Sequence, residues 1–234
     1  MTSETVQQTE VVWRIEFFGG VCLSRQGQRR PPFKTRRMTR LLARLACFPD
    51  RAHARDILAE ELWPEEDPEA IRERFRQTLA LLRRELEPEN VAAGSVLIAD
   101  RSTVRLAPDS FTTDIADFAA SLRVASEETD PARQIAPLRQ AVALYQGDLR
   151  PGFDEDWIQI ERLHLAERHR QALVRLTEAL TATGQLSEAI ETARRTIAAA
   201  PLYEEAHCTL IRLFAQTGRI ADAHRQYETL ERLL

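Results

Sequence analysis

The sequence predicts a mainly α-helical protein with small β-sheets, in which an N-terminal winged helix-turn-helix domain is followed by an all-α domain of tetratricopeptide-like repeats. Two patterns support this fold class. Strand-like segments, three amphipathic helices and a hairpin follow one another before residue 110, and a repeat of 34 residues lies near the C-terminus. The expected boundaries are 1–10 for a disordered N-terminus, 11–109 for the winged helix, 110–130 for a linker and 131–234 for the repeats.

The first domain begins with strand-like segments and a basic helix. Residues 12–17 and 21–23 read as short strands, and Gly19 and Gly20 supply the turn between them. Thr35 is a favourable N-cap for the first helix, which Pro49 and the following aspartate end. Apolar side chains recur along this helix with helical spacing, at Met38, Leu41, Leu42, Leu45 and Ala46.

Two more helices and a hairpin complete this domain. A short helix is expected at about 54–62, with Ile57, Leu58 and Leu62 on its buried face. Asp67 as N-cap and Pro68 at the first helical position start a third helix. Short strands follow at 96–98 and 104–106. The third helix carries one apolar stripe, made by Ile71, Phe75, Leu79, Leu82 and Leu86.

The second half of the chain contains an internal repeat. The segment TGQLSEA at 183–189 returns as TGRIADA at 217–223, an offset of 34 residues, which is the tetratricopeptide period. At the same offset, Ala172 and Leu176 match Ala206 and Leu210. Because stacked helix pairs need about three repeats for stability, helices at 131–146 and 155–168 are expected to supply the rest.

Composition predicts a cytoplasmic protein with no membrane partner. The apolar fraction is 44%, no apolar run is long enough to span a bilayer, and the N-terminus lacks the features of a signal peptide. Cys22, Cys47 and Cys208 are odd in number, far apart and without a CxxC motif, which favours reduced, packed thiols over disulfides or a zinc site.

The net charge of −4 is unevenly distributed. Residues 1–109 contain 18 basic and 17 acidic side chains, whereas residues 110–234 contain 14 and 19. The stretch from Phe17 to Pro49 holds eight basic residues and no acidic one. A basic surface of this kind favours contact with nucleic-acid phosphates despite the negative total.

The third helix is the candidate for reading DNA bases. At 100° per residue, Glu73, Gln77, Ala80 and Arg84 point directly away from its apolar stripe. A recognition helix needs long polar side chains opposite an apolar seat. A solvated helix face is the alternative interpretation, and the order of basic helix, third helix and hairpin favours DNA. The candidate base contacts are Arg72, Arg76, Gln77, Arg83 and Arg84.

Two other segments are candidates for contact with the DNA backbone and the minor groove. Lys34, Arg36 and Arg37 lie at the N-terminus of the first helix, where backbone amides favour phosphate. They are expected to hold phosphates without discriminating between sequences. An ordinary solvated surface is the alternative for both segments. The wing candidates at the hairpin are Arg101, Ser102 and Arg105.

The sequence carries no pattern for catalysis, a cofactor or a metal. Its eight glycines form neither a P-loop nor a dinucleotide fingerprint, and its five histidines show no HExxH spacing. The acidic run before Trp157 suits a helix N-terminus. We therefore expect no catalytic residue, no metal and no cofactor, in a protein that is not an enzyme.

Several segments resemble the Streptomyces antibiotic regulatory protein (SARP) family. In the first domain they are KTRR and LLA within 34–43, LWP at 62–64, and R, FRQ and LRREL within 72–86. The run AVALYQGD at 141–148, PGF at 151–153, Trp157 and the repeats resemble that family's bacterial transcriptional activator domain (BTAD). The resemblance spans roughly 12–234, and the order of the motifs is more specific than any one of them.

The resemblance implies an OmpR-like winged helix in a transcription activator. Such an activator binds direct repeats in double-stranded DNA near promoters, as head-to-tail pairs, and contacts RNA polymerase or its sigma factor. The loop between the second and third helices would face the polymerase, with Trp63, Glu65, Glu66 and Asp67 as candidates. The sequence departs from the family at His53, where a Ser or Thr N-cap is usual, in its incomplete third repeat and in having no ATPase domain after the repeats.

A second function class remains open. The acidic C-terminal half and the concave surface of stacked helix pairs also fit a scaffold for proteins, or a sensor of a small ligand, whose winged helix is degenerate. A salt-dependent DNA-binding titration separates the two, because only the regulator binds DNA at low salt.

Overall fold

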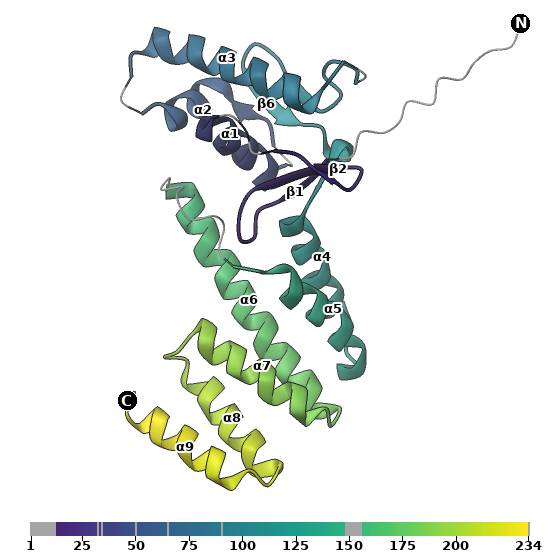
Figure 1. The fold of residues 1–234 in the computed structure, drawn as a ribbon, viewed down its shortest axis with the longest axis vertical. Coiled ribbons are helices and arrows are strands. Elements are labelled where there is room, and N and C mark those ends of the chain that lie inside the picture. The colour runs from purple at the N-terminus through teal and green to yellow at the C-terminus, as the bar shows by residue number, and fades with distance from the viewer. Residues whose placement is uncertain are drawn as a thin grey trace, which may run out of the picture. The chain divides into compact units, whose positions relative to one another are not determined.

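The computed structural model describes residues 13–31, 33, 35–49, 51–64, 66–89, 91–147 and 156–233. The described residues up to Ile115 form one compact unit and those from Ala116 form another (Figure 1). No helix in these described ranges is both long and apolar enough to cross a membrane.

A four-stranded sheet opens the first unit. Its strands are β1 (Trp13–Glu16), β2 (Cys22–Arg25), β3 (Gln28–Arg29) and β7 (Phe111–Thr113), in the order β3-β2-β1-β7. β1 runs antiparallel to β2 and parallel to β7. Trp13, Ile15 and Phe17 alternate along the chain into the core. Glycine is needed between β1 and β2 because Gly19 and Gly20 have φ values of 74° and 144°.

The segment expected as a linker is instead folded. Residues 110–130 contain β7, which follows the short 3₁₀ helix η1 (Pro108–Ser110), and helix α4 (Asp114–Glu127). The buried carboxylate of Asp114 accepts the backbone N–H groups of Phe17 and Phe18 at 2.7 and 2.8 Å. Strand pairing and this carboxylate attach the segment to β1, and neither partner is close in sequence.

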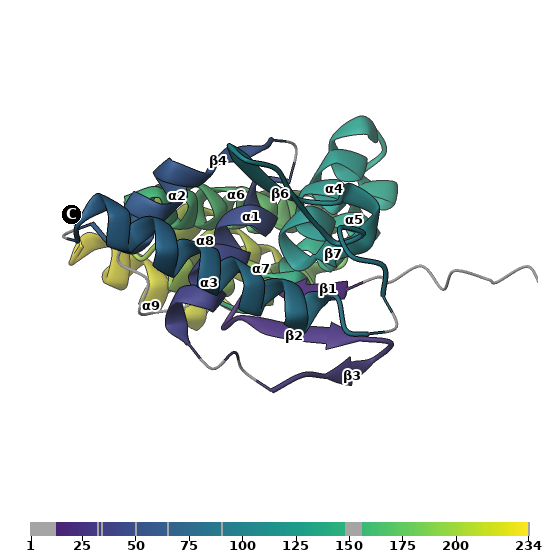
Figure 2. The same cartoon turned by 90° about the horizontal axis from the view of Figure 1, so that it is seen from above.

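Three helices and a second sheet complete the first unit. The helices are α1 (Arg36–Cys47), α2 (Arg55–Leu62) and α3 (Pro68–Leu86), and the sheet has the order β4-β6-β5, from β4 (His53–Ala54), β5 (Leu97–Ala99) and β6 (Thr103–Leu106). In Figure 2, strands β1 to β3 and strands β4 and β6 lie on opposite sides of α1. The predicted hairpin therefore forms two of the three strands of this sheet, because β4 pairs with β6.

One prediction for the buried face of α2 is wrong. Ile57 is 56% exposed, whereas Leu58, Ala59 and Leu62 are buried. A helix of eight residues presents one narrow stripe to its neighbours, and positions 58, 59 and 62 occupy it. All five residues of the predicted α3 stripe are buried.

The second unit is a stack of α-helices arranged in the order of the sequence. After α4 come α5 (Pro131–Leu144), α6 (Asp156–Ala182), α7 (Leu186–Ala199), α8 (Glu204–Gln216) and α9 (Ile220–Glu231), and consecutive helices from α5 onward pack on each other. The helix expected at 155–168 is the first part of α6, which runs unbroken for 27 residues because no glycine or proline interrupts it.

The two copies of the repeat form the same turn. Gly184 and Gly218 have φ values of 75° and 72°, and the N–H group of the next residue bonds a carbonyl five positions back in each copy, Gln185 to Leu180 and Arg219 to Phe214, both at 2.8 Å. This is the Schellman arrangement that ends a helix. It reverses the chain between α6 and α7, and again between α8 and α9.

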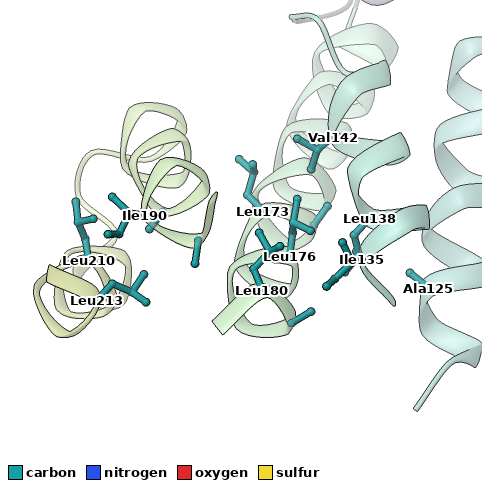
Figure 3. Packing of buried hydrophobic residues seen from close by; sticks show 14 of the residues in the cluster. Ala125, Ile135, Leu138, Val142, Leu173, Leu176, Leu180, Ile190, Leu210 and Leu213 are labelled. Atoms are coloured by element: carbon teal, nitrogen blue, oxygen red, sulfur yellow. The ribbon is translucent and has the colours of Figure 1, made fainter. Parts of the chain in front are cut away.

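One apolar cluster runs through the helical unit (Figure 3). The matched residues of the repeat, Ala172 with Ala206 and Leu176 with Leu210, are all buried. The small residues let the helices approach closely while the leucines fill the layers between them. The labelled side chains come from α4 (Ala125), α5 (Ile135, Leu138 and Val142), α6 (Leu173, Leu176 and Leu180), α7 (Ile190) and α8 (Leu210 and Leu213).

Candidate nucleic-acid interface

Helix α3 is seated firmly and begins as its sequence predicts. The Asp67 carboxylate accepts the N–H groups of Glu69 and Ala70 at 3.0 and 3.3 Å, and Pro68 occupies the first turn. Phe75 and Leu82 are 2% and 0% exposed. Since one side of the helix is buried, the opposite side is held in place toward solvent.

The exposed side of α3 is organised by the carboxylate of Glu73. Arg76 donates Nε and Nη2 to its two oxygens at 2.9 and 2.8 Å, and Gln77 donates Nε2 at 2.8 Å. These bonds, that of Arg76 first, hold the pKa of Glu73 below its usual value. Two of the predicted base-contact side chains therefore lie side by side on a shared acceptor, which we call the Glu73 clamp.

The remaining candidate base-contact residues on α3 differ in whether their side chains already have a partner. Arg84 is exposed and has no partner among the described residues. Arg72 is exposed, with its Nε 3.7 Å from the carboxylate of Asp56. Leu81, which the sequence analysis did not single out, is 49% exposed one turn after Gln77. The signal in the sequence was that Leu81 is an apolar residue outside the predicted apolar stripe, next to the polar face of the helix.

The Arg83 side chain bonds other residues of its own domain. Its Nη2 donates to the carbonyl of Leu97 in β5 at 3.0 Å, and its Nε lies 3.5 Å from the Glu87 carboxylate. Arg83 therefore joins α3 to the hairpin, and its predicted role in base contact stays a prediction.

Glu87 is a positioning residue that the sequence analysis missed. Its side chain is 2% exposed and accepts the N–H groups of Gly94, Val96 and Leu97 at 2.8–2.9 Å. The carboxylate at the end of α3 thus fixes the start of β5. A glutamate after a helix gives no such signal in sequence, because the N–H groups that donate to it lie seven to ten residues away.

The hairpin tip is ordered by Asp100. Its Oδ1 accepts the N–H groups of Ser102 and Thr103, each at 2.7 Å, and its Oδ2 accepts the Thr103 hydroxyl at 2.8 Å. These bonds, with that from Thr103 first, hold the pKa of Asp100 far below its usual value. Arg101 and Ser102 are left exposed at the tip, and Arg105 on β6 is half-buried.

The start of α2 depends on the hairpin. Its N-cap, Ala54, offers no side-chain hydrogen bond, and the N–H group of Arg55 donates instead to the carbonyl of Ser102 at 2.9 Å. His53 is buried with its Nε2 3.3 Å from the Phe48 carbonyl, and burial lowers its pKa. The hairpin therefore supplies the cap that the local sequence lacks.

The N-terminus of α1 is basic and exposed. Thr35 caps it by accepting the Met38 N–H group at 3.3 Å. Arg36 and Arg37 are exposed, and the Arg37 guanidinium lies 5.1 Å over the ring of Trp63. Lys34, the third phosphate candidate, lies outside the described residues.

A comparison with known families decides which group this chain falls into. The family model of the bacterial transcriptional activator domain matches residues 113–234, slightly more than half of the chain. The chain belongs to the bacterial transcriptional activator domain family. With the relatives described next, this match identifies a SARP-type regulator with a BTAD.

Two relatives agree with this assignment. The regulatory protein AfsR of Streptomyces coelicolor is 29% identical over 195 residues, which cover 83% of this chain and 19% of AfsR, so this chain spans about a fifth of that protein. Mycobacterium tuberculosis EmbR, in a structure with a low-affinity phosphopeptide, has the same fold with a TM-score of 0.77 at 21% identity, over 93% of this chain and 58% of EmbR.

The loop between α2 and α3 of this SARP-type regulator is tied to the domain. Trp63 is 3% exposed, so its ring belongs to the core and does not offer a contact surface. Asp67 is used as the cap of α3. Glu66 is paired with Arg74 and lies 3.9 Å from Arg37, and Glu65 lies outside the described residues.

No cluster of three or more metal-ligating side chains occurs in the part of the BTAD protein that the structure describes. Cys22, Cys47 and Cys208 are half-buried and form no disulfide with one another.

Proposed function

We propose that this regulator binds double-stranded DNA sequence-specifically and activates transcription. Helix α3 enters the major groove, the tip at Arg101 and Ser102 enters the adjacent minor groove, and Arg36 and Arg37 hold phosphates. Cognate sites are direct repeats near promoters, occupied by head-to-tail pairs of the chain. The loop before α3 contacts RNA polymerase or its sigma factor.

The observation that carries this proposal is the exposed face of α3. This face presents Arg76, Gln77 and Arg84 toward solvent. The helix is held in place by its buried apolar stripe and by the Glu87 carboxylate, which accepts backbone N–H groups at the start of β5. Arginine pairs with guanine and glutamine with adenine through two parallel hydrogen bonds, and an apolar side chain such as Leu81 fits a thymine methyl group. A rigid seat lowers the entropy cost of presenting these groups together.

The proposed polymerase contact rests on two glutamates. Trp63 is buried and Asp67 caps α3, so the candidates kept for a partner are Glu66, which is also paired with Arg74, and Glu65, which lies outside the described residues. AfsR is described as a regulatory protein, and recruitment of polymerase by this much shorter chain rests on the family resemblance.

The test is a fluorescence-polarisation titration against fragments of the promoter region beside its gene, at several salt concentrations. Arg76→Ala or Gln77→Ala is expected to weaken cognate binding by about 5- to 100-fold and leave non-specific binding within about threefold, since base contacts and phosphate contacts separate in this way. Arg133→Ala is the matched control, because Arg133 is an exposed arginine on α5.

An equal loss on cognate and non-specific DNA would show that these side chains do not read bases. Absence of any binding at low salt would overturn the DNA-binding proposal and leave the scaffold or ligand-sensing function.

A further inference from the structure

We propose that the helical unit binds a small phosphorylated molecule through its phosphoryl group, in the cavity between α4 and α6. The cavity has a volume of about 290 Å³, near the lower end of the range of about 300–1,000 Å³ for small-molecule sites. It is lined by Leu122, Arg123 and Ser126 of α4 and by Arg168, Gln171 and Arg175 of α6, with two alanines. This proposal does not rest on DNA binding.

The two helices present their polar side chains to the same space. On α6, Arg168, Gln171 and Arg175 are spaced three and four residues apart and share one face. On α4, Arg123 and Ser126 are three residues apart and also line the cavity. Three guanidinium groups therefore converge on one cavity from two elements.

Two of these guanidinium groups are not neutralised. In the described ranges, neither Arg168 nor Arg175 pairs with a carboxylate. Arg168 lies 5.5 Å over the ring of Phe118, and Arg175 donates one N–H group to the carbonyl of Ala125 at 2.9 Å. Since a guanidinium has five N–H donors, each keeps donors for a ligand.

The acidic groups nearby are already paired with other side chains. Glu127 binds Arg123 at 2.8 Å, and Glu167 accepts hydrogen bonds from Arg170 and from Gln171. Among the residues described, no acidic side chain lines the cavity. Two uncompensated positive charges remain.

This arrangement suits a phosphoryl group better than a carboxylate. A carboxylate has two oxygens and one negative charge, which a single guanidinium fork satisfies. A phosphoryl dianion has three free oxygens and about two charges, so it uses several guanidinium groups together. The remaining volume, beside Leu122 and the alanines, accepts the rest of a small molecule.

Arg168 is the residue to test. Arg175 also closes the end of α4 through the Ala125 carbonyl, so its loss affects folding as well as binding. The guanidinium of Arg168 lies over the ring of Phe118, which is itself 0% exposed, and the aliphatic part of a glutamine still covers that ring.

The experiment is isothermal titration calorimetry of the full chain with inorganic phosphate, against sodium chloride at equal ionic strength. We expect millimolar affinity for phosphate in the unaltered protein. Arg168→Gln is expected to weaken it by about tenfold, and Arg133→Gln, which removes the same charge from exposed α5, by less than about twofold. Thermal unfolding of Arg168→Gln and Arg133→Gln verifies that both variants are folded.

Three results would overturn the proposal. The first is no phosphate binding in excess of chloride. The second is equal binding by the unaltered protein and folded Arg168→Gln. The third is that Arg168→Gln leaves phosphate binding unchanged but reduces DNA affinity and its salt dependence, which would assign the cavity to the DNA backbone.

Discussion

Glu73 occupies the centre of the exposed face of α3, where a negative charge repels DNA. It accepts hydrogen bonds from Arg76 and Gln77, and each of them must give up this bond before it reaches a base edge. On non-specific DNA, Arg76 would exchange Glu73 for a single phosphate. In the proposed complex with a cognate site, both side chains would gain paired bonds to bases. We therefore expect the Glu73 clamp to favour the cognate site over random sequence.

Glu73→Gln is expected to strengthen non-specific binding and to lower the ratio of cognate to non-specific affinity by about two- to fivefold. Glu69→Gln is the matched control, since Glu69 is also exposed on α3 but bonds neither Arg76 nor Gln77. Polarisation titrations of both variants on both DNAs measure the ratio. If both variants tighten all DNA equally, the effect is one of net charge and the clamp has no role.

His169 is a second residue whose surroundings set its chemistry. It is 7% exposed, it stacks on Tyr145 at 4.3 Å, and burial first, then the charge of Arg195, lowers its pKa to about 4. The unfolded chain binds a proton to this histidine below about pH 6.5 while the folded chain does not, so this group costs stability as pH falls from about 6.5 to 4.

At pH 5.0 the histidine is expected to lower the free energy of unfolding by about 2 kcal/mol relative to pH 7.5. His169→Phe keeps an aromatic ring against Tyr145 and removes the titrating group, so its stability is expected to lose about 2 kcal/mol less over the same interval. Urea unfolding at both pH values measures this difference. An identical pH dependence in the two proteins would place His169 in a more hydrated environment.

At the scale of elements, the recognition helix and the hairpin are connected by buried polar bonds. Glu87 accepts three backbone N–H groups from residues 94–97, and Arg83 bonds the carbonyl of Leu97. The hairpin in turn supplies the carbonyl that caps α2. These contacts fix the position of the hairpin relative to α3.

Glu87→Ala is expected to lower the stability of the first unit by about 2–4 kcal/mol, because three buried N–H groups lose an ionised acceptor. DNA affinity should fall with it, since the wing is no longer fixed to α3. Glu89→Ala, an exposed glutamate two residues later, serves as the control and is expected to have an effect within about 0.5 kcal/mol. Chemical unfolding followed by circular dichroism measures both. A neutral Glu87→Ala would show that water replaces the carboxylate.

At the scale of the whole molecule, the two units carry different candidate sites. The first unit carries the exposed face of α3 and the basic start of α1, and the second carries the repeats and the arginine-lined cavity. The proposed contacts with DNA and with polymerase both belong to the first unit but use different residues, so we expect mutation to separate them.

The double variant Glu65→Ala with Glu66→Ala is expected to bind promoter DNA within about threefold of the unaltered protein, because the removed charges are acidic and do not contact phosphates. We expect transcription from the same promoter to fall several-fold in a reconstituted assay with RNA polymerase, as interface charges steer the partner. Unchanged transcription would remove this loop from the mechanism.

Local patterns were sufficient for helices α1 to α3 and for the repeat. Asp67 with Pro68, Thr35, and the glycines of the two repeat turns act on neighbours within a few residues, so their effects can be read from the chain alone. The apolar stripe of α3 and the outward direction of Arg76, Gln77 and Arg84 follow from helix geometry in the same way.

Tertiary structure decided what depends on distant partners. β7 was missed because its partner β1 lies almost a hundred residues earlier, and Asp114 binds the N–H groups of Phe17 and Phe18 over a similar separation. Arg83 and Arg76 look alike in sequence, yet one bonds the hairpin and the other faces solvent. By itself the sequence determined helices α1 to α3, which face of α3 is polar and where the repeat turns, but it did not indicate α4. The tertiary structure decided which arginines remain available to bind DNA or a ligand, because an arginine pairs with the carboxylates and backbone carbonyls that lie close to it in space.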